Sequence, residues 1–308
     1  MATPDHIGVQ DGINYNEIPA KIRRRPYYVV LPGLIILIGI MIPFVTAIAL
    51  SCTNYSFKLP TTKFVFLKNW IAMFSNKDFY HALSVTLRYA IYCTGIQMIL
   101  GTIVAFLLKA DNWFTRILKV LFTFPLMVAP AIAVLVWQLM TSNSVGVLEK
   151  FLNLLGVFNF PWAASKQTAM FTVVLIDTWV NMPFVILLVS AGINSLPKSP
   201  FEAAQVDGAG RLQRIWHITL PGIRSTFIML CIISVGSIMS AGFDQIYIFY
   251  NELVYETGDI IDTYVYRVGL EEMRFGLSTA VGLFKNVIGF ILVYGTNRLA
   301  AHWGEGIW

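Results

Sequence analysis

Six long apolar runs, separated by shorter polar joints, constrain this chain more than any other feature of its sequence. Each run is long enough to supply the roughly 20 apolar residues that an α-helix needs to cross a bilayer. Only helices and closed barrels satisfy every backbone polar group within hydrocarbon. The pattern therefore predicts an all-α, polytopic membrane protein with six transmembrane helices, at about residues 27–50, 84–108, 118–140, 169–192, 223–249 and 277–299.

The composition agrees with a chain that lies mostly in lipid. Hydrophobic residues make up 56% of the 308 residues and charged residues only 13%, whereas a soluble domain has about 25% charged residues. We expect one transmembrane domain over residues 27–308, preceded by a polar tail at 1–26. Nucleic-acid binding is not expected, because no basic patch with interleaved aromatic residues occurs.

The basic residues Arg23, Arg24 and Arg25 precede the first apolar run, as they do in a signal peptide. The run over 27–50 is longer than the 7–15 apolar residues of a signal peptide, so we interpret it as an uncleaved span. Lysines and arginines are more numerous on the side of the N-terminus than on the opposite side. This bias predicts that both termini are cytoplasmic.

The polar segment 199–221 lies between the fourth and fifth apolar runs and is too short to cross a membrane. Its first residues have the spacing of a capping box, with Ser199 as N-cap, Pro200 at the first helical position and Glu202 at the third. A helix is therefore predicted to begin at Ser199.

Two glycines, Gly208 and Gly210, then interrupt this predicted helix, since glycine favours a helix C-terminus. A second short helix is expected from about Arg211 to His217, and Pro221 is expected to end it. The segment is thus predicted to be a compact helix–glycine–helix unit outside the bilayer.

The same segment resembles the EAA loop of ABC importer permeases. The resemblance implies that the loop docks into a groove on a cytoplasmic ATPase subunit, and that Trp216 contacts this groove or the membrane surface. An ordinary cytoplasmic loop with helix caps is the alternative. The residues that match the family's pattern, apart from Ile218, are Glu202, Ala203, Ala204, Asp207, Gly208, Ala209, Leu220 and Pro221.

The resemblance also implies the partners of this chain. They are a second, homologous permease subunit, two cytoplasmic ATPase subunits and an extracytoplasmic sugar-binding protein, all assembled at a membrane lipid bilayer. The sequence has no Gly-x-x-x-x-Gly-Lys-Ser/Thr loop for phosphate binding. We therefore expect no cofactor on this chain itself, no metal and no catalytic residue, with ATP and Mg²⁺ used by the ATPase subunits.

Several polar side chains fall within the apolar runs, where they usually face a cavity or the interior of a bundle. Asp244 and Gln245 have the chemistry of a sugar site, but Asp244 could instead pair with Lys285. Asp177 could pair with Lys285 equally well. Serines at 234, 237 and 240 share a helical face, which is the arrangement by which small hydroxyl residues pack helices together.

Within ABC permeases, the chain is most similar to the carbohydrate-uptake branch. The stretch Thr178-Trp179-Val180-Asn181-Met182-Pro183-Phe184 resembles that branch's T-W-x-x-x-P-[FY] pattern. By this resemblance the sugar would be lined by Val180, Asn181, Phe184, Gly242, Gln245 and Tyr247, to which Asp244 is added from its chemistry. The maltose permease has an amide where this chain has Gly242, so the sugar contacts must differ.

The expected function is that of a permease subunit in an ATP-driven ABC importer for an oligosaccharide or a related sugar, in a prokaryotic cytoplasmic (inner) membrane. One alternative is a carrier driven by an ion gradient. Another is an ABC permease for a solute other than a sugar, such as a polyol or a glycerophosphate. An intramembrane enzyme is disfavoured, because no paired catalytic groups occur at bilayer depth.

Overall fold

The structure is a computed structural model that describes residues 25–110, 112–142, 146–156, 160–162, 166–240, 242–249, 258–302, 304 and 306. Residues 1–24, which make up nearly all of the predicted N-terminal tail, lie outside the described residues. The chain divides into two units, residues 1–49 and 50–308, and each is described by itself.

The first unit is represented by α2 (Arg25–Ser51), a 27-residue helix that includes Pro32 and Pro43. Every side chain from residue 30 to residue 46 is exposed. Such a helix, apolar on all of its faces, is suited to lipid rather than to water. The part over Val30–Ser51 is long and apolar enough to cross a membrane, which agrees with the first predicted span.

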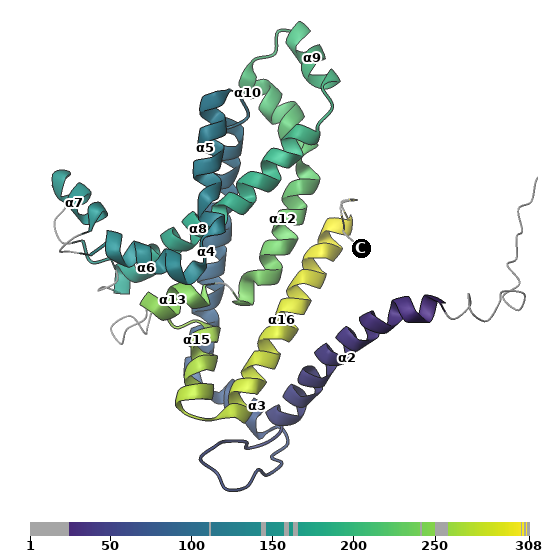
Figure 1. The fold of residues 1–308 in the computed structure, drawn as a ribbon, viewed down its shortest axis with the longest axis vertical. Helices are drawn as coiled ribbons and strands as arrows, with labels where there is room; N and C mark the ends of the chain where they lie inside the picture. The colour runs from purple at the N-terminus through teal and green to yellow at the C-terminus, as the bar shows by residue number, and fades with distance from the viewer. Residues whose placement is uncertain are drawn as a thin grey trace, which may run out of the picture. The chain divides into compact units, whose positions relative to one another are not determined.

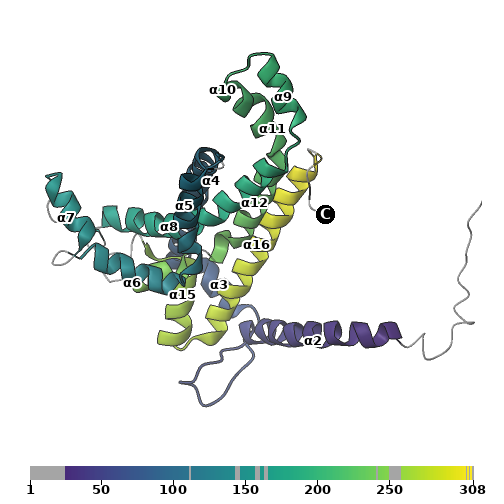
Figure 2. The same cartoon turned by 45° about the horizontal axis from the view of Figure 1, so that its top comes forward.

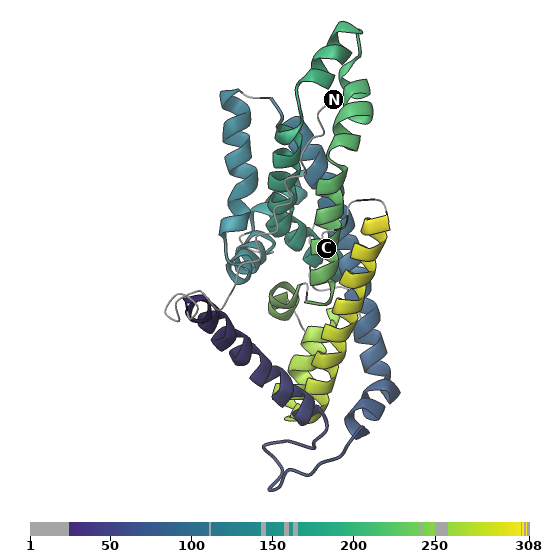
Figure 3. The same ribbon diagram turned by 90° about the vertical axis from the view of Figure 1, so that its right-hand side faces the viewer.

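Four long helical segments organise the second unit (Figures 1 and 3). They are α4 (Lys77–Leu107), α8 (Lys166–Ser195), α12 (Arg224–Ser237) with its continuation, and α16 (Phe275–His302). With α2, the described residues contain five helices that could span a membrane, or six if one bent pair counts as a span. The all-α polytopic architecture is thus confirmed.

Short helices gather at opposite ends of these long segments (Figures 1 and 2). One end carries α9 (Ser199–Val206), α10 (Arg211–Arg214), the π-helical turn η2 (Ile215–Thr219) and α11 (Leu220–Gly222). The other end carries α3 (Lys68–Ser75), α15 (Ile261–Tyr266) and the π-helical turn η5 (Arg267–Glu271). The polar segment predicted to lie outside the bilayer is therefore at one extreme of the unit. Figure 1 shows a further helix, α7 (Val147–Leu154), beyond α6 (Pro130–Met140), the second helix of the bent pair.

The third predicted span is a bent pair of helices rather than one straight helix. It consists of α5 (Trp113–Thr123), the 3₁₀ turn η1 (Phe124–Met127) and α6 (Pro130–Met140), with a bend of 108°. Val128 is extended just before Ala129 and Pro130. Proline lacks an N–H and disfavours helical geometry in the preceding residue, so the prolines in this stretch redirect the chain.

The fifth predicted span is also interrupted. Helix α12 ends at Ser237, the 3₁₀ turn η3 (Ile238–Ser240) follows, and α13 (Phe243–Phe249) begins after Gly242. Gly242 has a φ of +83°, and a methyl group at this position would overlap the ring of Tyr89 on α4. Both the backbone conformation and the close approach of Tyr89 therefore require glycine.

Helix α4 is the element common to three clusters of buried side chains. Its first part contributes Phe79 to a cluster with α3, α15 and α16, and its middle contributes Val85 to a cluster with α6, α8 and α13. Its last part contributes Ala105 to a cluster with α8 and α12. Gly101 lets α8 come close, because a Cβ there would lie 2.8 Å from Val185.

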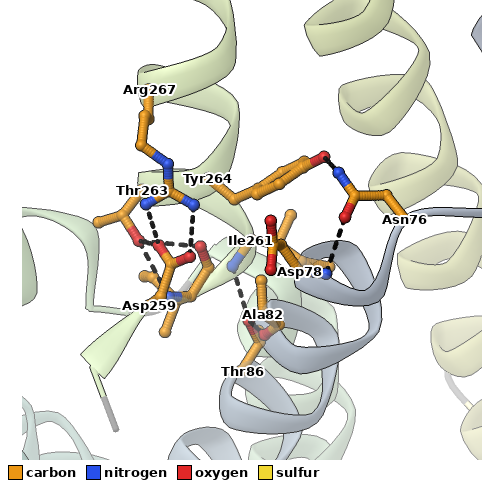
Figure 4. A network of polar contacts seen from close by, with 10 residues as sticks. Asn76, Asp78, Ala82, Thr86, Asp259, Ile261, Thr263, Tyr264 and Arg267 are labelled. Carbon is orange, nitrogen blue, oxygen red and sulfur yellow. Dashed lines mark hydrogen bonds and ion pairs between the residues drawn. The ribbon is translucent and has the colours of Figure 1, made fainter. Parts of the chain in front are cut away.

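A polar network fastens α15 to the beginning of α4 (Figure 4). The Ile261 N–H donates to Thr86 Oγ1 at 2.8 Å, and Asn76 Nδ2 donates to the hydroxyl of Tyr264 at 3.1 Å. Arg267 makes two hydrogen bonds to Asp259, the shorter of 2.7 Å. The charged bidentate pair is among the stronger polar contacts and joins Asp259, just before α15, to Arg267, the residue after it.

Replacing Gly242 with alanine tests the interruption of the fifth span. We expect Gly242→Ala to destabilise the protein by about 2 kcal/mol or more, because it combines backbone strain with overpacking against Tyr89. Thermal unfolding followed by size-exclusion chromatography in detergent would measure the loss. Gly95→Ala is the control, since a Cβ there meets open space. Equal stability of the two variants would contradict the close approach.

Candidate functional site

The EAA-like segment forms two short helical limbs at one end of the second unit. The first limb, α9, starts at Ser199 as predicted, but the capping box was wrong. Lys198 is the N-cap residue and already has helical dihedral angles, and no side chain caps the helix. Ser199 and Pro200 therefore lie in the first turn, and the amide of Glu202 donates to the Lys198 carbonyl at 3.1 Å.

Gly208 ends the first limb, as the sequence predicted. It has a φ of +76°. The Ala209 N–H donates to the Ala204 carbonyl at 2.8 Å, and the Gly208 N–H donates to the Gln205 carbonyl at 3.2 Å. These two bonds define a Schellman motif, which needs a left-handed residue at the position of Gly208. The spacing between the alanine pair and the glycine is thus the spacing of a helix end.

The second limb continues further than the sequence predicted. Helix α10 passes into the π-helical turn η2 and then α11, which contains Pro221 in its first turn. Pro221 does not stop the chain from being helical, because a first turn requires no N–H from proline. The limb instead leads to α12, which begins at Arg224.

The two limbs present an apolar surface to their surroundings. Val206 is 88% exposed, Leu212 72% and Trp216 67%. Glu202, Ala203 and Asp207 are also exposed. Between the limbs is a hollow of about 340 Å³, lined by Ala204, Asp207, Gly208, Ala209, Gln213, Arg214, His217 and Ile218. Large apolar side chains that are rimmed by polar ones are typical of a protein-binding surface.

One cation–π contact joins the first limb to the joint between α4 and α5. Lys109 Nζ lies 4.5 Å from the centre of the Phe201 ring. Partial burial lowers the pKa of Lys109, and the positive charge of Arg214 lowers it further. The limbs are therefore in contact with the end of α4 as well as with α8 and α12.

A second feature is a cavity of about 420 Å³ among the long helices of the second unit. Its walls come from α4, η1, α8, α12, η3 and the start of α13. The wall is rich in amides and hydroxyls, since it includes Gln97, Asn181 and Gln245 together with Thr94, Ser234, Ser237 and Ser240. The remaining lining residues are Ala90, Cys93, Leu126, Asp177, Phe184, Val185, Ile233, Ile238 and Gly242.

The carboxyl group of Asp177 is the centre of the polar wall. Asp177 is only 4% exposed. Gln97 Nε2 from α4 donates to its Oδ2 at 2.8 Å, and Asn181 Nδ2 from α8 donates to its Oδ1 at 2.9 Å. Gln245 Nε2 from α13 donates to the same Oδ1 at 3.2 Å. Three amides from three helices thus meet at one carboxyl group.

Four of the seven residues predicted to line a sugar site do line this cavity, namely Asn181, Phe184, Gly242 and Gln245. The other three lie elsewhere. Val180 is 4% exposed and packs in the core cluster of α4, α6, α8 and α13. Asp244 is exposed, because a helix turns consecutive residues by about 100° and Gln245 takes the inward position.

Tyr247 is the third of these residues, and it belongs to a group of aromatic side chains outside the cavity wall. Its hydroxyl is hydrogen-bonded to that of Tyr266 at 2.9 Å. Its ring stacks on Phe243 with centroids 5.4 Å apart. Of the two aromatic residues that the sequence assigned to the sugar, Phe184 lines the cavity and Tyr247 contacts other aromatic residues.

Lys285 pairs with neither of the two aspartates considered from the sequence. Its Nζ lies 2.5 Å from Oδ1 of Asp262 on α15. Both side chains are largely buried, so the carboxylate of Asp262 compensates the charge of Lys285 within α16. Asp262 lies in the polar joint before the last span, which is why a search confined to the apolar runs missed it.

Gln97 and the serines extend the site beyond the sequence-based prediction. Gln97 is a polar residue in the middle of the second apolar run, and that signal was available in the sequence. Ser234, Ser237 and Ser240 were considered as residues that pack helices together, yet all three line the cavity. Their helical spacing correctly predicted one shared face, but the face borders a space rather than another helix.

The fold and these two features define a multi-pass, all-helical membrane permease. Residues 97–302 match the family described as binding-protein-dependent transport system inner membrane component. The chain belongs to this family. It is therefore the non-catalytic, inner-membrane permease of a binding-protein-dependent ABC importer.

Two relatives from Bacillus subtilis (strain 168) are similar to most of the chain. Protein LplB is 34% identical over 231 residues, which cover 74% of this chain and 72% of LplB. The polygalacturonan/rhamnogalacturonan transport system permease protein YteP is 29% identical over 283 residues, which cover 91% of this chain and 88% of YteP.

The fold is also similar to that of a bacterial ABC transporter involved in the import of the acidic polysaccharide alginate. In its crystal structure the matched chain has a TM-score of 0.81 and 26% identity, covering 92% of this chain and 96% of that chain. In a second crystal structure the alginate transporter is in complex with an alginate pentasaccharide-bound periplasmic protein. That match has a TM-score of 0.83 and 25% identity, covering 93% and 97% of the two chains.

Filling the cavity should block transport. We expect Ser237→Trp to lower substrate uptake at least tenfold in cells that carry the complete transporter, because the indole would occupy the space beside Asn181 and Gln245. Membrane levels are checked by immunoblotting. Cys231→Trp is the matched control, since Cys231 is an exposed residue on the same helix. Normal uptake by Ser237→Trp would show that substrate does not use the cavity.

Proposed function

We propose that this chain is one of two homologous permease subunits of an ATP-driven importer for an oligosaccharide or a related sugar. The proposal rests on the wall of the cavity, where amide and hydroxyl groups face a space within the membrane-spanning helices. Such groups both donate and accept hydrogen bonds, as sugar hydroxyl groups require. Relatives that are named for polygalacturonan/rhamnogalacturonan transport and for alginate import support the same class of substrate.

The exposed limbs of the EAA-like segment are the proposed ATPase-docking surface. Val206, Leu212 and Trp216 are large, exposed apolar side chains on the two limbs. Contact with a groove on an ATPase subunit would remove them from water. In this proposal the loop and both termini are cytoplasmic, and two ATPase subunits, which use ATP and Mg²⁺, bind the two permease subunits.

Close packing beside the loop gives a route by which its movement reaches the cavity. A Cβ on Gly192 of α8 would lie 2.6 Å from Thr226 Oγ1 on α12, and one on Gly222 would lie 2.7 Å from Leu196 Cδ2. These contacts brace α8 against α12 where both helices meet the limbs. Asn181 lies 14 residues before Ser195, a helical distance of about 21 Å. The braced pair therefore connects the docking surface to the cavity wall.

The opposite end of the unit is the proposed entry side. An extracytoplasmic binding protein would deliver the sugar there, as a periplasmic protein is present in the complex of the alginate transporter. The network around Asp259 and Arg267 would keep that end rigid while α8 and α12 move. Alternating exposure of the cavity would then follow from the movement of the limbs driven by ATP.

Two glycines that are two residues apart test the coupling role of the loop. We expect Gly208→Val to abolish uptake and the co-purification of ATPase subunits, because a β-branched residue does not tolerate a φ of +76°. Gly210→Val should retain at least half of both, since Gly210 has a φ of −66°. Affinity purification and uptake assays would measure the two effects.

Reconstitution of the purified protein into proteoliposomes distinguishes an ABC importer from a carrier driven by an ion gradient. The proposal expects uptake into proteoliposomes only when both the ATPase subunits and ATP are present. Uptake by the isolated chain under a proton or sodium gradient would contradict it, as would full coupling in Gly208→Val.

A further inference from the structure

The cavity wall has a distinctive charge composition. Among the described residues that line it, none is a lysine, an arginine or a histidine, and one, Asp177, carries a carboxyl group. A saccharide bearing carboxylate groups would lose hydration on entry and would find no cationic group on this wall. Burying an unpaired charge is costly, whereas hydroxyl groups require only hydrogen bonds.

The hydrogen bonds of the wall strengthen this bias toward hydroxyl donors. Gln97, Asn181 and Gln245 each commit one of their two amide N–H groups to Asp177, which restrains the orientation of the amide. Ser237 Oγ donates to the carbonyl of Ser234 at 3.0 Å and retains lone pairs that can accept. The oxygens of these groups can accept hydrogen bonds from sugar hydroxyls, but a carboxylate has no proton to give them.

Two cations at the end of the unit that holds α15 are already paired. Lys285 is bonded to Asp262 at 2.5 Å, and Arg267 is bonded to Asp259 at 2.7 Å. Moving either cation to the cavity would leave a largely buried aspartate without its partner, which costs several kcal/mol. Neither is therefore available to a bound anion.

We propose that this cavity takes uncharged saccharides and discriminates against those that carry carboxylate groups. This inference rests on the proposed sugar transport and specifies the substrate class of the same site. The similarity in fold to a transporter of an acidic polysaccharide does not extend to the charge of the ligand. The amide cluster around Asp177 is the part of this chain that sets the preference.

Ligand binding to the complete transporter in lipid nanodiscs, without the binding protein, tests the inference. The probes are maltotriose, xylotriose and mannotriose as neutral trisaccharides, and trigalacturonate and triguluronate as charged ones. Saturation-transfer NMR suits weak binding and reports each probe separately. We expect at least one neutral probe to give a signal at least tenfold stronger than either uronate, and Ser237→Trp to remove it.

A second experiment introduces a cation into the cavity wall. Ser237→Lys should raise the ratio of uronate to neutral signal at least tenfold, because the ammonium group supplies the missing partner. Cys231→Lys, outside the cavity, should leave the ratio unchanged. A uronate signal in the unmodified complex equal to the best neutral signal would overturn the inference while leaving sugar transport intact.

The remaining outcomes are also decisive. An unchanged ratio in Ser237→Lys would show that this wall does not set the charge preference, which overturns the assignment to this chain. Absence of signal from all five probes would contradict the sugar site itself, and with it the proposed function.

Discussion

The arrangement of the second unit depends on the hydrogen bonds that the carboxyl group of Asp177 accepts. A buried carboxyl group within a membrane-spanning helix is stable only if its oxygens have hydrogen-bond partners. Here the partners are amides from α4, α8 and α13, so one side chain ties together three segments that are distant in sequence. The cavity is the space left beside this cluster, and its polarity follows from the groups that the carboxyl group requires.

Helix α4 completes this arrangement on the apolar side. It contributes to all three core clusters, and Tyr89 on the same helix lies against Gly242. The break in the fifth span therefore lies where the chain packs closely against α4. The hydrogen-bonded cluster at Asp177 and the apolar packing of α4 together position the cavity.

The sequence predicted six spans, and the described residues contain five helices that could span a membrane, or six if the bent pair α5–α6 counts as one. Apolar runs of this length have few alternatives in lipid. It also predicted the glycine that ends α9, since a Schellman motif is local. It did not predict the 108° bend between α5 and α6, although Pro125 and Pro130 were visible. Proline weakens a helix, but whether the chain bends or continues depends on what packs around it, as the opposite outcome at Pro221 shows.

The polar contacts were harder to predict for a related reason. Asp177, Asp244 and Lys285 were correctly recognised as residues that need an explanation, but their partners depend on which helices are adjacent. Lys285 is paired with Asp262 from outside the apolar runs. Gln245 faces the cavity and Asp244 does not, a distinction that requires the rotational setting of α13, and a helix of seven residues provides little periodicity from which to fix it.

The interruption at Gly242 places residues that line the cavity on two separate helices, α12 and α13. Ser234 and Ser237 lie on α12, which is continuous with the exposed limbs, whereas Gln245 lies beyond the break on α13, beside α6 and α15. A displacement that starts at the limbs would slide one wall past the other. A bound molecule would then lose its contacts on one side before those on the other, so its release would proceed by shear across a glycine pivot rather than by an even widening of the space.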